Sequence, residues 1–376
     1  MNKKTVVFAL PVLCWPGLLL ATENDDAFQD YINEVICDSP EGNLIITCEA
    51  ATNTTGGSGE TLPQIGNTGM QGASEISARE QVSALGGELS KAFENWAVFS
   101  TVEHHNIDRD QTNLENGFGG DAFTLTAGAD YLLNQRWLLG GSLSKKEAKV
   151  DMNGQTGDLE TESLEWILFV DYRVSDSLSV DGYLGRVNQN SESTRAVEFG
   201  LIQYDAMADY DSTNEQWGVG VNYAFHQDQW SFSSSLSAQY NELTVDAYSE
   251  QGGDSIENLN LQFDEQVIES NKITLGLQSG YTQSLKQGVL IPYGNLELIY
   301  EMENDQRRID SRLVVAPDAE AFTIVTDAAD EFYGRIGAGI QYILPGGIML
   351  FGDASGLVAH DYFSTWKVAA GFRLEL

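Results

Sequence analysis

From residue 95 to residue 376, apolar and polar positions alternate with a period of two, which is typical of β-strands. In the segment 163–172, the even-numbered positions are Leu, Trp, Leu, Val and Tyr, whereas Glu165 and Asp171 lie on the opposite face. In the segment 366–376, the even-numbered positions are again wholly apolar, and Lys367 and Arg373 alternate with them. The pattern therefore predicts an all-β structure whose strands each have one apolar face.

The lengths of these segments distinguish a membrane barrel from a soluble sheet. Each has at least twelve residues, above the five or six typical of soluble strands and long enough for a tilted strand that crosses a membrane. We predict twelve strands, at 95–107, 120–133, 136–150, 160–173, 178–197, 206–225, 230–245, 268–284, 289–304, 327–343, 348–359 and 364–376.

The connections between the predicted strands alternate between two classes. Tight turns are expected at 134–135, 175–177, 226–229, 286–288 and 344–347. Mostly longer polar loops lie between them, around 108–119, 151–159, 246–267 and 305–326. Short turns on the periplasmic side and long loops on the outer side are typical of outer-membrane barrels. We therefore predict a 12-stranded antiparallel transmembrane β-barrel over residues 95–376, with both ends of the barrel sequence on the periplasmic side.

The first 94 residues differ in character from the barrel. Residues 1–21 combine two lysines, an apolar stretch and a small residue at Ala21, which predicts a cleaved signal peptide. Residues 22–72 form a short polar extension with a Gly- and Thr-rich linker at 52–59. In residues 73–94, apolar side chains recur at helical spacing, which predicts an α-helix that leads into the first strand.

Cys37 and Cys48 remain after removal of the signal peptide, because Cys14 lies within it. Two cysteines in an exported chain predict one disulfide that closes a small loop, in keeping with an oxidising periplasm. Two free thiols are the alternative.

The charge narrows the range of partners. The formal net charge of −36 and the pI of about 4.1 argue against binding to nucleic acid, because a polyanion repels phosphate. We expect a monomer whose partners are outer-membrane lipid, lipopolysaccharide and the barrel-assembly machinery. We expect no cofactor and no metal site. Weak binding of divalent cations by the acidic loops remains an open alternative.

Several short segments and single positions of the predicted barrel resemble those of the translocator domain of autotransporters, the type V secretion family. The matching positions are Trp96, Gly128 to Tyr131, Leu139 to Leu143, Val180 to Gly185, Arg195, Leu290 to Gly294, Glu301 and Gly371 to Leu374. Each is a weak signal, but the ordered set covers the whole predicted barrel.

The resemblance implies a twelve-stranded barrel with an α-helix in its lumen, preceded by a passenger that is exported to the cell surface. This chain departs from that pattern in having only the short extension before the helix, and in ending with Leu376 instead of an aromatic residue. Asn95 is the only asparagine between Ala73 and Trp96. We therefore predict no self-cleavage within the helix.

Two sets of barrel residues are candidates for functional roles. The charged and polar set is expected to line the lumen and to contact the helix: Glu165, Asp171, Tyr293, Asn295, Glu297, Glu301, Lys367 and Arg373. The apolar set at the C-terminus is expected to act as the barrel-assembly signal: Trp366, Phe372, Leu374 and Leu376.

Catalytic constellations are weak, so we predict no enzyme activity. Ser255 lies in a loop without a surrounding hydrolase domain, and the four histidines are expected to be polar rim residues. The favoured function is translocation or display of the chain's own N-terminal segment. A plugged pore and an outer-membrane hydrolase are the alternatives.

Overall fold

The computed structural model describes Tyr31 and residues 95–134, 136–153, 157–199, 202–253 and 259–376. Long antiparallel strands dominate these residues. The strands of the barrel are β1 (Trp96–Arg109), β2 (Phe118–Leu133), β3 (Trp137–Met152), β4 (Gly157–Arg173), β5 (Leu178–Phe199), β6 (Ile202–Gln227), β7 (Trp230–Val245), β10 (Gln266–Tyr281), β12 (Gly288–Glu301), β15 (Phe332–Leu344), β16 (Ile348–Val358) and β17 (Phe363–Glu375). The short strand β11 (Gln283–Leu285) follows β10 and pairs with the start of β12. No helix among the described residues is both long enough and apolar enough to cross a membrane.

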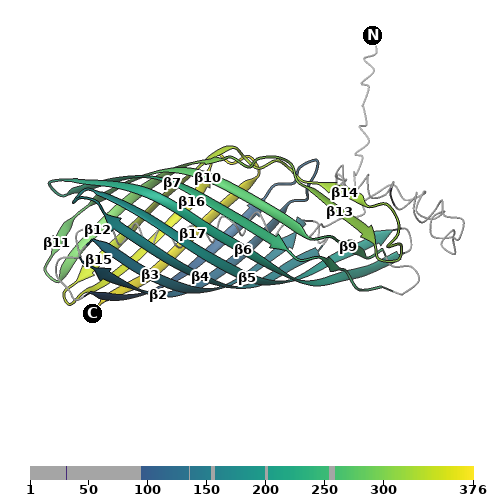
Figure 1. The fold of residues 1–376 in the computed structure, drawn as a ribbon, viewed down its shortest axis with the longest axis horizontal. Coiled ribbons are helices and arrows are strands. Elements are labelled where there is room, and N and C mark those ends of the chain that lie inside the picture. Colours follow the sequence, from purple (N-terminus) through teal and green to yellow (C-terminus); the bar gives the residue numbers. More distant parts are fainter. Residues whose placement is uncertain (1–30, 32–94, 135, 154–156, 200–201, 254–258) are drawn as a thin grey trace, which may run out of the picture.

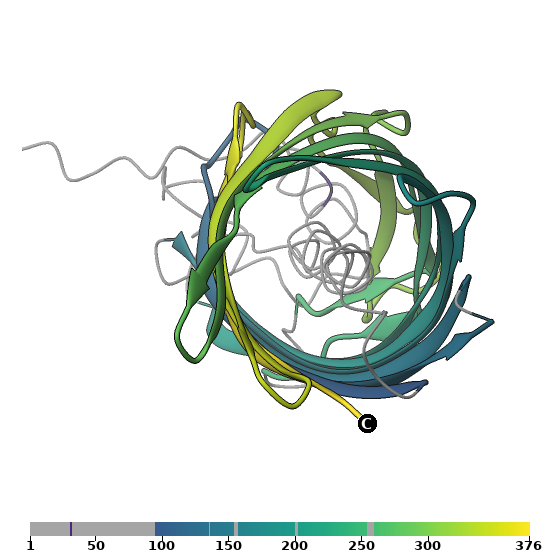
Figure 2. The same ribbon diagram turned by 90° about the vertical axis from the view of Figure 1, so that its left-hand side faces the viewer.

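The twelve strands form a closed ring, as Figures 1 and 2 show. Each strand pairs with the next barrel strand in the sequence, and β1 pairs with β17 over the register from Ala97 opposite Glu375 to Arg109 opposite Phe363. The predicted 12-stranded antiparallel barrel is therefore confirmed. The predicted helix at 73–94 lies outside the described residues, as does the extension at 22–72 apart from Tyr31.

The two ends of the barrel differ, as the sequence predicts. One end, here the turn end, carries the short connections and both ends of the barrel sequence, where the Leu376 amide donates to the Trp96 carbonyl at 2.8 Å. The other, here the loop end, carries the two longest connections, between β7 and β10 and between β12 and β15, together with short ones such as residues 200–201 between β5 and β6. In Figure 1 the turn end is on the left and the loop end on the right.

The outer wall presents the apolar face of the strands. Leu164 and Leu168 on β4 are more than half exposed there, whereas Glu165 between them is buried on the lumenal side. Aromatic side chains gather on the outer wall in two groups, as in the girdles at the two interfaces of a membrane. Those nearer the turn end include Trp96, Tyr131, Trp137, Tyr172 and Trp230, and those nearer the loop end include Phe123, Trp217, Tyr240, Phe332 and Trp366.

Inside the wall, aromatic rings cover glycines on the neighbouring strand. Phe99 lies directly opposite Gly128, and Phe169 lies directly opposite Gly140. A Cβ atom added at either glycine would overlap the ring of its partner. These glycines are therefore required because they let a large ring lie flat against the sheet, which stabilises a strongly curved wall.

A second, smaller sheet lies at the loop end and packs against the inner side of the wall. The loop sheet consists of β8 (Tyr248–Ser249), β9 (Leu261–Phe263), β13 (Arg308–Leu313) and β14 (Phe322–Val325), in the order β14-β13-β9-β8. Its fully buried side chains, among them Phe263, Leu313 and Ile324, pack against inward-facing wall residues such as Val150 and Leu243. The segments 246–267 and 305–326 were expected to be polar loops, so this expectation was wrong. The four strands have only two to six residues, too few for a clear alternation among the surrounding Asp, Gly and Asn.

Candidate functional site: the lumen and its loop end

The predicted lumenal residues lie on the inner side of the wall, and several of them form polar pairs. Arg373 binds Asp130 through two hydrogen bonds of 2.5 and 2.9 Å. The carboxylate of Glu165 accepts a hydrogen bond of 2.6 Å from the side-chain amide of Gln216. The remaining members are Asp171, Tyr293, Asn295, Glu297, Glu301 and Lys367; Glu297 pairs with Arg335 at 2.9 Å, and Tyr293 lies over Gly339. These pairs join adjacent strands, or strands with one strand between them, on the inner wall.

Other charged side chains are buried on the inner wall, and the sequence pattern did not single them out. His105 contacts Glu103 at 3.2 Å, and both side chains are almost completely buried. Glu103 also lies within electrostatic reach of Lys146 and Lys367. His105 was expected to be a polar rim residue, and this was wrong. It shares odd-numbered parity with Phe99 and Thr101 on β1, so alternation alone would have placed it inside.

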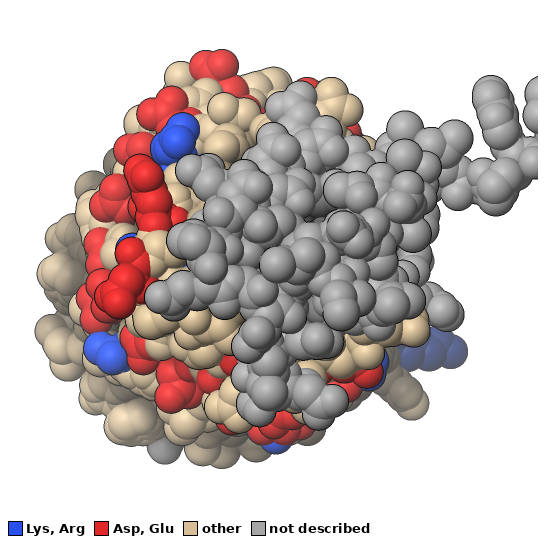
Figure 3. Space-filling view, turned by 90° about the vertical axis from the view of Figure 1, so that its right-hand side faces the viewer, with Lys and Arg blue, Asp and Glu red and all other residues tan. Residues whose placement is uncertain are grey.

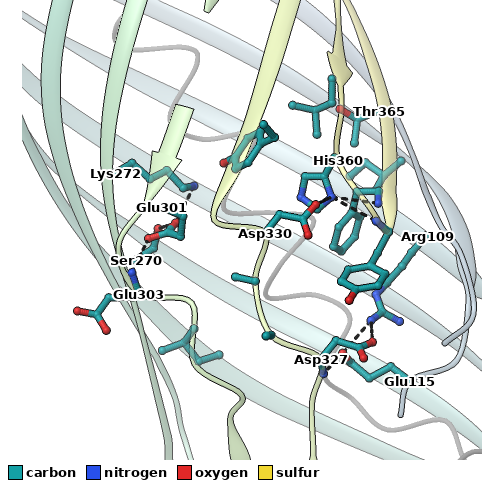
Figure 4. Close-up of a pocket in the computed structure, with 18 of the residues that line it drawn as sticks. Arg109, Glu115, Ser270, Lys272, Glu301, Glu303, Asp327, Asp330, His360 and Thr365 are labelled. Carbon is teal, nitrogen blue, oxygen red and sulfur yellow. Dashed lines mark hydrogen bonds and ion pairs between the residues drawn. The ribbon is translucent and has the colours of Figure 1, made fainter. Parts of the chain in front are cut away.

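A cavity of about 410 Å³ lies within the barrel near the loop end (Figure 4). One side is formed by Ser270, Lys272 and Glu301, where Ser270 donates to Glu301 at 2.7 Å and Lys272 lies 3.8 Å from the same carboxylate. The facing side carries Asp330 and His360. The cavity therefore has walls of both charge signs, and most of these charges contact each other directly.

The segment 326–331, here the strap, connects β14 to β15 and forms part of the cavity wall. Asp327 is the first acidic residue of the strap. Its carboxylate accepts hydrogen bonds from Arg109 at 2.5 Å and from Thr112 at 2.6 Å. The Asp327 amide donates to Glu115 at 2.8 Å, and Arg109 also binds Glu115 at 2.8 Å. Burial raises the pKa of the Glu115 carboxyl, although the charge of Arg109 opposes the shift. This cluster fixes one end of the strap to the connection between β1 and β2.

The other end of the strap is held by His360, which lies in the connection between β16 and β17. Its Nδ1 atom is 2.7 Å from Asp330, and its ring contacts Tyr333 and Phe363. Burial lowers the pKa of His360, and the neighbouring Asp330 opposes this shift. His360 was expected to be a polar rim residue. It does lie at the loop end, but its side chain is largely buried and pairs with Asp330 of another loop. Ser255, the weak candidate nucleophile, lies outside the described residues.

The connection between β7 and β10, residues 246–265 and here the first long loop, is fixed to the wall by a second buried arginine. Arg195 on β5 binds both carboxylate oxygens of Glu250, at 2.8 and 2.5 Å. The pair also binds the loop backbone, since Arg195 donates to the Leu259 carbonyl at 3.1 Å and the Leu261 amide donates to Glu250 at 2.8 Å. Arg195 thus ties the segment that carries β8 and β9 to the wall, and Arg109 ties the strap that follows β14.

The other candidate residues lie apart from this site. Trp366, Phe372 and Leu376 are exposed on the outer wall and at the turn end, and Leu374 is partly buried beside β1. Cys37 and Cys48 lie outside the described residues. The described residues contain no group of three or more His, Cys, Asp and Glu side chains arranged to hold a metal ion.

Charged side chains cover the outer face of the wall beyond the loop-end aromatic group. Figure 3, which looks onto the loop end, shows many carboxylates and few Lys or Arg side chains. Two of the cations on the outer face pair with carboxylates across strands: Lys149 with Glu160 at 2.6 Å and Arg186 with Glu215 at 3.0 Å. This rim is therefore polar and strongly acidic, in contrast to the apolar band beside it.

A comparison with protein families matches residues 98–355 to the autotransporter β-domain. The chain belongs to the autotransporter family. It is an outer-membrane autotransporter barrel, and the resemblance seen in its sequence is confirmed.

Curated relatives are distant from this autotransporter. An uncharacterized protein in the trpE-trpG intergenic region of Pseudomonas putida is 29% identical over 213 residues, which cover 54% of this chain and 34% of the relative. The esterase EstA of Pseudomonas aeruginosa is 23% identical over 255 residues, which cover 65% of this chain and 38% of EstA. The matched part is thus little more than a third of the length of either relative.

Solved structures share the barrel fold. The translocator domain of the autotransporter NalP from Neisseria meningitidis has a TM-score of 0.63 at 13% identity, covering 84% of this chain and 100% of that domain. The β-domain of the Bordetella autotransporter BrkA has a TM-score of 0.54 at 15% identity, covering 75% of this chain and 100% of that domain.

Proposed function

We propose that this barrel exports its own short N-terminal segment and displays it on the cell surface. One observation carries the proposal: Tyr31 packs into the core of the loop sheet, whereas Trp96 begins β1 at the turn end. The segment that joins them has to pass from one end of the barrel to the other. Because the outer wall is apolar, the polar lumen is the route that a hydrophilic segment can take.

The length of the connecting segment is compatible with this path. A membrane core of about 30 Å requires about 20 helical residues or about 10 extended residues. Residues 32–94 exceed either requirement. In this arrangement the loop end faces the cell exterior and the turn end faces the periplasm. The signal peptide at 1–21 is removed, and Cys37 and Cys48 form a disulfide in the exported segment.

The proposal assigns no catalytic role to the described residues. His360 and Asp330 contact each other, and the His360 ring also contacts aromatic rings and the backbone amides of the following turn. This pairing holds the strap in place. The esterase activity named for EstA is a property of that relative. Because His360 is assigned no catalytic role, His360→Ala is expected to leave any hydrolysis measured with this protein unchanged.

The partners proposed from the sequence fit the polarity of the wall. Lipid tails contact the apolar band, and lipopolysaccharide contacts the acidic rim beyond it through shared divalent cations. Trp366, Phe372, Leu374 and Leu376 are proposed to present the last strand to the barrel-assembly machinery. The barrel is proposed to act as a monomer.

Export is tested by inserting an epitope into the linker at 52–59 and labelling intact cells with an antibody. We expect labelling on intact cells, because the proposal makes the linker part of the exported segment that includes Tyr31. The same epitope in the turn at 345–347 is the matched control, which should be labelled only after permeabilisation. A heat-shift gel reports whether each barrel is folded. A folded barrel with no labelling of the linker would contradict export and favour a plugged pore.

A further inference from the structure

One side chain of the N-terminal extension completes the core of the loop sheet. Tyr31 is only 8% exposed, and its ring lies 5.0 Å from the ring of Phe322 at an angle of 32°. It belongs to the same apolar cluster as Leu313 and Ile324, which are fully buried. A residue far from the barrel in the sequence is therefore packed as a core residue of the loop end.

Tyr31 packs at the edge of the loop sheet. Phe322 is the first residue of β14, and β14 pairs with β13 on one side and begins the strand order of the sheet. Edge strands in proteins are commonly covered by another element of the chain. Tyr31 places one side chain of the N-terminal extension against the first residue of this edge strand.

The contact depends on packing rather than on a polar interaction. The Tyr31 hydroxyl is buried near the backbone of Leu313, but it lacks the geometry of a hydrogen bond to any group in the described part of the chain. A buried hydroxyl without a hydrogen bond is unfavourable, so the attraction comes from the ring. Replacement by phenylalanine should therefore preserve the contact, whereas alanine should remove it.

We propose that the loop sheet is the docking site for the exported N-terminal segment, with Tyr31 as its anchor. The docked segment stays on the cell surface through noncovalent contacts, even when its covalent link to the barrel is cut. This inference rests on the proposed export function and adds to it a defined receptor surface, centred on Phe322, Leu313 and Ile324.

The test uses the full-length protein with an epitope and a thrombin site inserted together between Ala51 and Thr52, the epitope first. Thrombin is added to intact cells, and the epitope is then measured in the cell pellet and in the medium. We expect the wild-type fragment to stay with the cells. Tyr31→Ala should increase the released fraction at least tenfold, because loss of a buried aromatic side chain weakens binding by more than this factor. Tyr31→Phe is the matched control and should retain the fragment as well as wild type.

The outcomes separate docking from export. Cleavage on intact cells followed by complete release of the wild-type fragment overturns docking and leaves export standing. Cleavage only after lysis, with a heat-shifted barrel, overturns export and docking together. If Tyr31→Ala fails to fold, Phe322→Leu changes the other side of the contact, and retention equal to wild type in that folded variant contradicts the assigned surface. Retention by wild type and Tyr31→Phe with release from Tyr31→Ala supports it.

Discussion

The pair formed by Arg195 and Glu250 illustrates how single residues hold the loop end. Both side chains are at most 5% exposed, and each also binds the backbone of the first long loop. Removing two charges from water is costly, and direct bidentate contact in a dry environment offsets much of that cost. Arg109 is also buried, but it divides its bonds between Glu115 and Asp327 and so fixes the strap that follows β14.

Replacing one partner should open the first loop without unfolding the barrel. Arg195→Met leaves Glu250 buried and unpaired, which lowers the free energy of local unfolding by about 3–5 kcal/mol. The measurement is the rate at which a protease cuts residues 246–265 in the folded, purified protein. The double variant Arg195→Met with Glu250→Met should recover most of the loss, and a heat-shift gel should show an intact barrel in both. Equal cutting of wild type and Arg195→Met would contradict this role.

At the scale of the strands, the two faces of the wall place different requirements on the side chains. The outer face needs apolar side chains, and the inner face needs side chains that fit the curvature of a closed ring. Phe169 lies directly across from Gly140, and Tyr183 lies directly across from Gly218, with the ring in the place that a Cβ atom would occupy. Glycine is therefore specified by the ring on the neighbouring strand.

Gly140→Ala should reduce the folded fraction of the barrel several-fold, because the added methyl group displaces the ring of Phe169 from the sheet. The folded fraction is measured as the heat-shifted band in isolated outer membranes. Gly294→Ala is the matched control, since the nearest atom to its added Cβ lies 3.7 Å away. We expect the control to fold as well as wild type. A folded fraction for Gly140→Ala that matches this control would show that the wall tolerates a displaced ring.

At the scale of the whole molecule, the apolar part of the outer wall between the two aromatic groups, here the apolar band, decides where the barrel lies in the membrane. The aromatic groups mark the two borders of the band, and the acidic rim begins beyond the loop-end border. Because lipid tails cannot solvate a charge, the same substitution has different effects inside and outside the band.

Leu168→Arg places a charge on the lipid-facing side of β4, within the band. It should lower the free energy of unfolding in lipid bilayers by about 2–4 kcal/mol, as measured by denaturant titration. Glu192→Arg lies on the outer face of β5 in the acidic rim, opposite Glu160 and Asp209, and should cause no such loss. Similar effects of the two substitutions would place the band elsewhere on the wall.

Alternation in the sequence determined the number of barrel strands, their direction and the face that each side chain occupies. This succeeded because solvation by lipid or by a polar lumen acts on every residue individually, so it leaves a local pattern of period two. The same parity placed Glu165, Lys367 and Arg373 inside the barrel, where the structure has them.

Only the tertiary structure decided how the loop sheet and the strap are held at the loop end. Arg195 and Glu250 are 55 positions apart in the sequence, Arg109 and Asp327 are 218 apart, and Tyr31 reaches Phe322 from the other end of the chain. Pairings of this kind depend on the ring bringing distant loops to one place, and no local pattern records that placement. The strands of the loop sheet were missed for the same reason, because their stability comes from packing against the wall rather than from their own two to six residues.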